Sequence, residues 1–185
     1  GYGTFADPSI PPTNASILDG ILAIKHKLDE HNRLVERKLR LCAHGGQQIA
    51  GLDYDESYAP AILATSFRLT VVMACHLGVW LFHLDVSNAF QSTPDRDPKT
   101  FLRCFPEYLL WFESRFPAKY AALRKRHPTV DAHDLAMLML KYVQGRVDAS
   151  LQWKHAIEEV LIDELGLVPN RADSCVYTGR VEGEL

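Results

Sequence analysis

The stretch WLFHLDVSNAF at positions 80–90 places one carboxylate, Asp85, at the end of an apolar run. The run of residues 79–86 predicts a strand that is buried on both faces. An aspartate at a strand end can cap the next turn, here formed by residues 87–89. Alternatively, a carboxylate held on a rigid strand edge could bind Mg²⁺, which takes one or two carboxylates together with substrate phosphates. The stretch by itself leaves both interpretations open.

The composition is that of a folded domain. The chain has 185 residues, of which 47% are hydrophobic and 23% are charged, so it can bury a core as one domain or two small lobes. The net charge of -3 does not indicate nucleic-acid binding, although a local basic face could still contact phosphates.

Several classes of site and location are disfavoured. The four cysteines form no C-x-x-C pair and the eight histidines show no H-E-x-x-H pattern, so a zinc site is not expected. Scattered free thiols suit a reducing compartment. No apolar run reaches the length of a membrane span, and the first fourteen residues do not resemble a signal peptide. We therefore expect an intracellular protein, cytoplasmic or nuclear, that is not secreted and does not associate with membranes.

Local patterns predict a mixture of strands and helices. Residues 17–28 and 33–43 are expected to pair as a hairpin around the turn DEHN at 29–32. Its second strand alternates, which places Lys38 and Arg40 on one face. A helix is expected over residues 65–78, with Thr65 or Ser66 as its cap and Gly78 at its end.

The second half of the chain continues the mixture. The following elements are expected there: a turn at 93–98, a strand near 101–104, helix over 107–127 broken at Pro117, a helix capped by Ser150 and closed by Gly166, and a strand over 173–178. Residues 134–143 fit a helix or a strand, and residues 144–150 a loop. This order indicates an α+β fold, in which the helix containing Trp153 packs against the strand that ends at Asp85.

Six segments, in order, resemble the reverse transcriptases of copia-type LTR retrotransposons. The segment HLDVSNAF contains the family's LDVxxAF motif. The other matches are KLRLCAHG (38–45), GLDYDESYAP (51–60), SFRLTVVMACHLG (66–78), QGRVDASLQW (144–153) and GLVPNRADSCVYTG (166–179). The resemblance covers roughly residues 21–179 and is specific because the order and spacing agree as well as the motifs.

The resemblance implies a two-metal polymerase that extends a primer with dNTPs, using Mg²⁺ or Mn²⁺. It makes Asp85 a catalytic metal ligand, with the Val86 carbonyl as a further ligand. Lys38 and Arg40 would bind the triphosphate, although they could also form a solvated strand face. Phe90 would lie under the sugar and exclude a ribose, or be an ordinary core aromatic. Gln144 and Gly145 would lie near the nucleotide, or Gly145 be a plain turn glycine.

The sequence also departs from the family. Val147, Asp148 and Ser150 replace the Lys, Gln and Pro of the family's GLKQAP segment, and His44 replaces an Arg. The chain contains no adjacent Asp-Asp pair, so we expect a fragment that ends before the family's Y-x-D-D motif and is inactive alone.

The expected organisation is an irregular lead-in over residues 1–16, then β-hairpin fingers and part of an antiparallel palm over 17–185, with a possible insertion at about 107–134. A template-primer of RNA or DNA and dNTPs would be its partners, with integrase and RNase H regions in the same polyprotein. The alternatives are a non-catalytic remnant of a decayed element and a small nucleotide- or nucleic-acid-binding domain.

Overall fold

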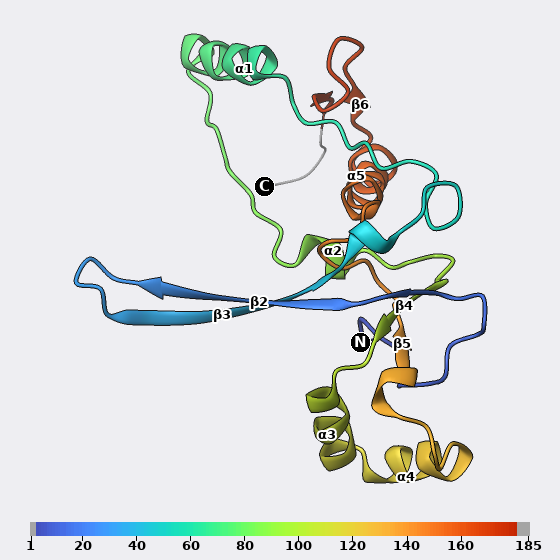
Figure 1. The fold of residues 1–185 in the computed structure, drawn as a ribbon. Coiled ribbons are helices and arrows are strands. Elements are labelled where there is room, and N and C mark those ends of the chain that lie inside the picture. Colours follow the sequence, from blue (N-terminus) through green and yellow to red (C-terminus); the bar gives the residue numbers. More distant parts are fainter. Residues whose placement is uncertain (1–2, 181–185) are drawn as a thin grey trace.

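A computed structural model describes residues 3–180 (Figure 1). At its centre lies a three-stranded sheet in the order β1 (Ser16–Leu18), β4 (Thr100–Arg103), β5 (Ala136–Leu138). β1 runs parallel to β4, and β5 runs antiparallel to it. The core cluster around this sheet is Leu18, Ala43, Leu102, Cys104, Leu109, Leu135, Met137, Met139 and Val143. The fold is therefore a mixture of helices and small sheets, as expected, although the central sheet is not wholly antiparallel.

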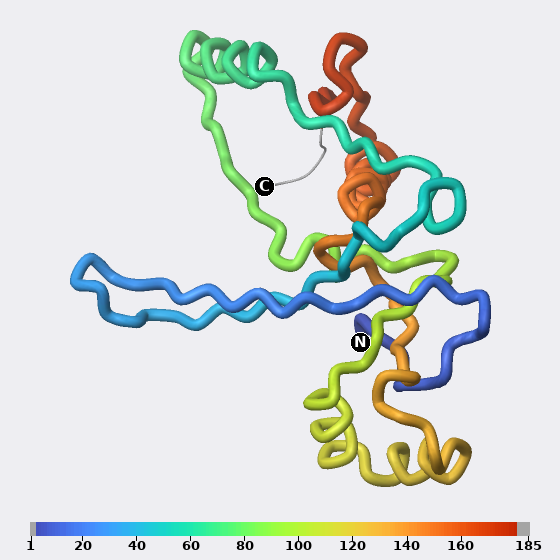
Figure 2. The backbone as a smooth tube through the Cα atoms, in the orientation of Figure 1, coloured from blue at the N-terminus to red at the C-terminus, as the bar shows by residue number. Residues whose placement is uncertain are grey.

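The hairpin is confirmed. β2 (Gly20–Leu28) pairs antiparallel with β3 (Leu34–Ala43), and Figure 2 shows the two strands as a long arm that leaves the rest of the chain. In the turn, the Asp29 carboxylate accepts hydrogen bonds from the backbone of His31 and Arg33, and Asn32 adopts a positive φ of 58°. Asparagine tolerates this left-handed conformation, so the polar turn residues reverse the chain.

The break at Pro117 is also confirmed. α3 (Pro106–Arg115) and α4 (Pro117–Arg126) each begin with a proline, which has no backbone N–H to lose at that position. α3 buries Leu109 and Phe112 toward the core. After the short 3-10 helix η2 (Ala132–Asp134), the ambiguous segment 134–143 becomes the strand β5 and the isolated bridges that follow it.

The helix preceding the LDV stretch is present, but its expected cap is wrong. α1 (Ala64–Leu77) begins after Leu63 and ends at Gly78 with φ +65°. Thr65 and Ser66 lie inside its first turn. The Leu63 N–H instead donates to Asp173 Oδ2 at 2.9 Å, so a residue distant in sequence takes the capping role.

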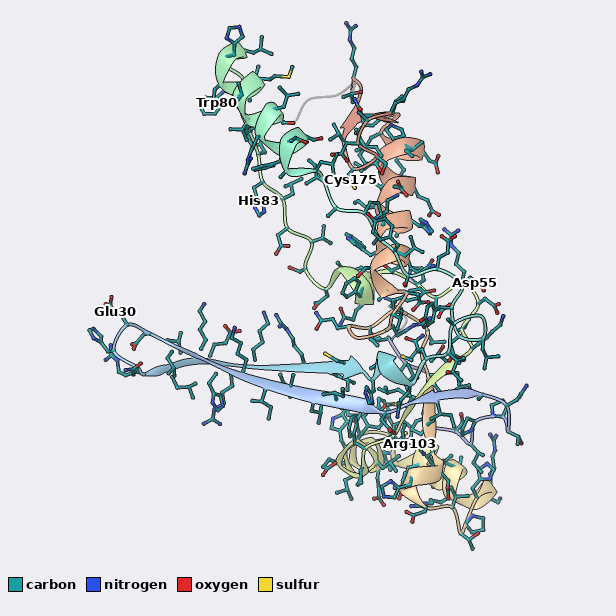
Figure 3. All side chains as sticks on the ribbon, turned by 45° about the horizontal axis from the view of Figure 1, so that its top comes forward. Glu30, Asp55, Trp80, His83, Arg103 and Cys175 are labelled. Carbon is teal, nitrogen blue, oxygen red and sulfur yellow. The ribbon has the colours of Figure 1, made fainter. Side chains whose placement is uncertain are left out.

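The strand expected over residues 79–86 does not form. The segment is irregular, and Trp80, Phe82 and Leu84 are 87%, 84% and 90% exposed. Trp80 and His83 project from it in Figure 3 with no strand alongside. Nothing in the part of the chain that is described, residues 3–180, pairs with this segment, and apolar residues alone do not make a strand without a partner edge. The sheet expected to end at Asp85 is therefore absent from these residues.

The C-terminal helix follows the expected pattern with two corrections. α5 (Ala149–Glu159) contacts the short helix α2 (Ala89–Ser92), so the prediction that the Trp153 helix packs on the Asp85 sheet is wrong. Its cap residue is Asp148 and not Ser150. The π-helical turn η3 (Val160–Glu164) extends it to Gly166, which has φ +66°. The expected strand 173–178 shortens to β7 (Tyr177–Thr178), paired with β6 (Val168–Pro169).

No helix within residues 3–180 combines the length and the apolar character that crossing a membrane would require.

Candidate functional site

A cavity of about 690 Å³ lies where the base of the hairpin meets the segment after the LDV stretch. Its walls come from β3, from residues 85–91 and from Val143 and Gln144, with Thr4 and Phe5 beside them. Six of the seven residues singled out from the sequence line it: Lys38, Arg40, Asp85, Val86, Phe90 and Gln144. The seventh, Gly145, follows directly on Gln144. The volume lies in the range of small-molecule sites.

The hairpin contributes the basic wall of the cavity. In the β2–β3 register, Lys38 lies directly opposite Lys25, and Arg40 lies opposite Ala23, so all four side chains project from one face. Both cavity residues, Lys38 and Arg40, are exposed. Like charges directly opposite each other destabilise a strand pair. An anion bound at this wall would relieve that repulsion.

The opposite wall carries the acid and the aromatic residue. Asp85 is exposed and accepts no hydrogen bond from any residue within 3–180, so it does not cap the following turn. Asn88 precedes α2 in the left-handed conformation, with φ +55° and ψ +42°. This reversal turns the chain into α2, where Phe90 is half-buried on the cavity.

The loop wall is fixed to the hairpin by a close backbone crossing. The Ala43 N–H donates to the Gln144 carbonyl at 2.8 Å. Gly145 has φ +92°, and a Cβ there would lie 2.1 Å from the Ala43 carbonyl oxygen. On the other side, a Cβ on Gly45 would lie 2.1 Å from the Gly145 carbonyl oxygen. Only glycine fits at these two positions, so the backbones of the loop and of the hairpin base can approach each other this closely.

A buried ion cluster supports the same loop from behind. Arg146, with a side chain only 3% exposed, donates to Asp95 at 2.7 Å and to Asp148 at 2.8 and 3.0 Å. Its guanidinium also lies 4.2 Å from the centre of the Tyr142 ring. Burial lowers the pKa of Arg146, but the hydrogen bonds and charges of Asp148 and Asp95 outweigh it and raise the pKa. Asp148, a departure from the family pattern, is thus the ion-pair partner of Arg146.

A second network fixes the root of the hairpin. Asp19, between β1 and β2, accepts hydrogen bonds from Gln47 Nε2 at 2.7 Å and Arg103 Nε at 2.9 Å. The bond from Gln47 and then that from Arg103 lower the pKa of Asp19. The carboxylate therefore stays charged near neutral pH and joins the central sheet to β2.

The metal-binding capacity of the described residues is limited. Within residues 3–180, no group of three or more His, Cys, Asp or Glu side chains is arranged to hold a metal ion. At the cavity, Asp85 and the carbonyl of Val86 are oxygen donors of the kind that Mg²⁺ accepts. They are too few to fill its octahedral shell. They fit an ion that is shared with ligand phosphates and water.

Two residues around the site, Gln91 and Arg146, were not predicted. Gln91 lines the cavity, and its buried Oε1 has no hydrogen-bond partner among the described residues. Arg146 was also missed. An Arg and an Asp two residues apart in a predicted loop, Arg146 and Asp148, were a usable signal of an ion pair.

Comparison with known proteins relates the first half of the chain to a family. A family model described as "Reverse transcriptase (RNA-dependent DNA polymerase)" matches residues 11–102. The Retrovirus-related Pol polyproteins from transposons RE1 and RE2 of Arabidopsis thaliana are each 35% identical over 80 residues, or 43% of this chain. That from transposon TNT 1-94 of Nicotiana tabacum is 38% identical over 66 residues, or 36% of this chain.

The matched part of the chain spans only 6% of the length of the two Arabidopsis relatives and 5% of the tobacco one. No solved structure matches the chain. The match includes α1 and also the hairpin, the LDV stretch and α2, and the last three supply most of the cavity wall. Through residues 11–102, the chain therefore belongs to the reverse transcriptase family, as a fragment related to the Pol polyproteins of copia-type retrotransposons.

Proposed function

We propose that the cavity is the nucleotide site of a reverse transcriptase that extends a primer with dNTPs. The observation that carries the proposal is the meeting of Lys38, Arg40, Asp85, Phe90 and Gln144 around one cavity, from three segments far apart in sequence. A deoxynucleoside triphosphate requires cations for its phosphates, a flat surface for its sugar and oxygen donors for its metal ion. The cavity contains all three kinds of group.

Each residue then has a role of its own. Lys38 and Arg40 bind the triphosphate from the hairpin wall. Phe90 lies against the sugar and excludes a ribose 2′-hydroxyl, the group that separates RNA from DNA precursors. Gln144 contacts the nucleotide from the loop wall. Asp85 and the Val86 carbonyl would hold Mg²⁺ or Mn²⁺, and the bound ion would supply positive charge for the phosphates and for activation of the attacking hydroxyl.

In this proposal, the β2–β3 hairpin forms fingers, and the region of Asp85, α2 and α5 forms part of a palm. Residues 1–16 are a lead-in, and α3 and α4 with the segment to residue 134 are an insertion. The whole protein would also bind a template-primer of RNA or DNA and would include integrase and RNase H regions.

The chain of 185 residues alone is proposed not to polymerise DNA. Phosphoryl transfer with two metal ions needs more anionic ligands than Asp85 supplies. Asp95 does not supply them, since its carboxylate is paired with Arg146. A longer Pol chain with a Y-x-D-D segment should incorporate dNTPs on a primed template, and Asp85→Asn in it should abolish incorporation. Incorporation that survives Asp85→Asn would overturn the assignment.

Binding can be tested on the chain itself with a fluorescent dNTP analogue and Mg²⁺. The double variant Lys38→Gln, Arg40→Gln should weaken binding at least about tenfold, because each cation makes a charge-assisted contact. The matched control is Arg68→Gln, Arg171→Gln, which removes the same charge from exposed positions outside the cavity. Equal losses in both variants would show that net charge alone matters.

A non-catalytic remnant is the competing interpretation. In a decayed element the changes in the 144–150 loop would be unrelated to each other. Here Arg146 pairs with Asp148 and with Asp95 in a buried cluster, so the altered loop is internally consistent. This observation favours a maintained fold. A longer chain that binds dNTPs but never incorporates them would support the remnant.

A further inference from the structure

The helices α3 and α4 carry a dense positive segment. Residues 115–127, RFPAKYAALRKRH, contain five Lys or Arg and no Asp or Glu, in a chain of net charge -3. In Figure 1 this helix pair lies on the opposite side of the hairpin from α1, α2 and α5. The segment lies outside the stretch matched by the reverse transcriptase family and does not line the cavity of about 690 Å³.

Two of the five cations have partners. Lys119 pairs with Asp7 at 2.8 Å, and Arg124 donates to the Val130 carbonyl at 2.7 Å while lying over the Tyr120 ring. Arg115, Lys125 and Arg126 are exposed and form no ion pair with any residue in 3–180. Cations at a helix C-terminus interact favourably with the helix dipole, but each stabilises the helix by less than about 1 kcal/mol. That effect does not account for three exposed cations that have no ion-pair partner within residues 3–180.

Exposed aromatic rings adjoin these cations. Trp111 is 51% exposed and lies one helical turn before Arg115. Its ring meets the 38% exposed ring of Phe116 edge to face, with centroids 5.8 Å apart. Lys119 Nζ lies 5.4 Å from the centre of the same Phe116 ring. The buried residues of α3 are Leu109 and Phe112, whereas Trp111 stays half exposed, with its ring also 5.4 Å from that of Tyr108.

We infer that the α3–α4 surface, defined by Trp111, Arg115, Phe116, Lys125 and Arg126, binds single-stranded nucleic acid. The cations would contact successive phosphates, and Trp111 would stack on a base. This combination of a cationic track with exposed aromatic rings is what single strands require, because their bases are free to stack. The inference rests on the proposed function, because a polymerase requires a template strand. It deepens that function by adding a contact with the strand that is remote from the nucleotide cavity.

The test is fluorescence anisotropy of labelled single strands, a 20-nucleotide oligo(dT) and an RNA of equal length, at several salt concentrations. The variant Lys125→Gln, Arg126→Gln should reduce the slope of log K against log[salt] by about 1.4, since each phosphate contact in a single strand contributes roughly 0.7. The control Arg68→Gln, Arg171→Gln should leave the slope unchanged. Equal effects of the two double variants would overturn the inference.

The aromatic contact has a separate readout. Trp111→Ala should weaken binding by about fivefold or more, and Trp111→Phe should recover most of it, because stacking is retained. In a Trp80→Phe, Trp153→Phe background, the strand should quench the fluorescence of Trp111. Absence of quenching while the strand is bound, or tighter binding of a blunt duplex of equal length, would also overturn the inference.

The two proposals fail separately. Lys38→Gln, Arg40→Gln should weaken binding of the dNTP analogue at least about tenfold and leave the Trp111 quenching intact. If the chain binds the strand at α3–α4 but never binds the dNTP analogue, the surface is supported and the nucleotide cavity is wrong. If the dNTP analogue binds and the strand does not, the surface is wrong and the cavity stands.

Discussion

At the scale of single residues, Gly145 combines a special backbone conformation with close packing. Two glycines with positive φ allow these effects to be separated. Gly51, at φ +79°, has nothing within 4 Å of an added Cβ, whereas a Cβ on Gly145 would lie 2.1 Å from the Ala43 carbonyl oxygen. We expect Gly51→Ala to cost about 1 kcal/mol and Gly145→Ala at least about 2 kcal/mol more, measured by urea unfolding. Equal costs would mean that the crossing of loop and hairpin is loose.

Arg146 provides a second test at this scale. Its side chain is 3% exposed, and those of its partners Asp95 and Asp148 are 7% and 8% exposed. Arg146→Met would leave two carboxylates buried without a cation, so we expect a loss of about 3–5 kcal/mol in the free energy of unfolding. Adding Asp95→Asn and Asp148→Asn should restore a large part of the loss. A single-variant loss below about 1 kcal/mol would show that the cluster is open to water.

At the scale of elements, Asp173 attaches the beginning of α1 to the C-terminal part of the chain. Among the residues of α1, Ala74 is the buried one, and Asp173 holds the N-terminus of the helix. Hydrogen bonds from the Ser66 hydroxyl and then from the Leu63 N–H lower the pKa of Asp173, with a smaller contribution from the Cys175 N–H. A carboxylate with a lowered folded-state pKa stabilises the fold above its unfolded value of about 3.9, and this contribution is lost as the pH falls through the folded value.

We therefore expect Asp173→Ala to speed amide exchange in the first turns of α1 several-fold, with little change in the β2–β3 hairpin. In the unmodified chain, lowering the pH from 5 to below the lowered folded-state pKa of Asp173 should have the same local effect, after correction for the intrinsic rate of exchange. The variant should not respond further to that change of pH. Uniform loss of protection over the whole chain would show instead that α1 and the central sheet unfold together.

Local signals predicted some elements well, for physical reasons. The signals that succeeded act within a few residues of the chain. They are the polar turn at 29–32, the alternation that aligned Lys38 with Arg40, the helix break at Pro117 and the helix end at Gly78. The strand predicted over residues 79–86 was wrong because a strand depends on a partner strand elsewhere in the chain. Asp95 and Arg146 lie 51 residues apart, and Leu63 and Asp173 lie 110 apart, so no local pattern could pair them. Phe90 and Gln144 were predicted only through resemblance to a family, whereas Asp85 was first singled out by its place at the end of an apolar run. The structure places all three around one cavity.

At the scale of the whole molecule, the apolar run after α1 is exposed, which departs from an ordinary surface. Trp80, Phe82 and Leu84 lie within five residues, and Leu77 and Val79 beside them are also exposed. Contiguous exposed apolar surface promotes association, whereas single exposed apolar residues are common and harmless. We expect the chain to self-associate as its concentration rises and to bind a hydrophobic dye.

Replacing Trp80, Phe82 and Leu84 with serine should shift the chain toward monomer in sedimentation velocity and reduce dye binding. The free energy of unfolding should change little, because the three side chains are already in water. The matched control replaces Leu52, Tyr58 and Val168 with serine, since these residues are also exposed but scattered along the chain. The control should leave association unchanged. If both triple variants reduce association equally, or if the first unfolds the chain, residues 79–84 do not form a continuous exposed surface in solution.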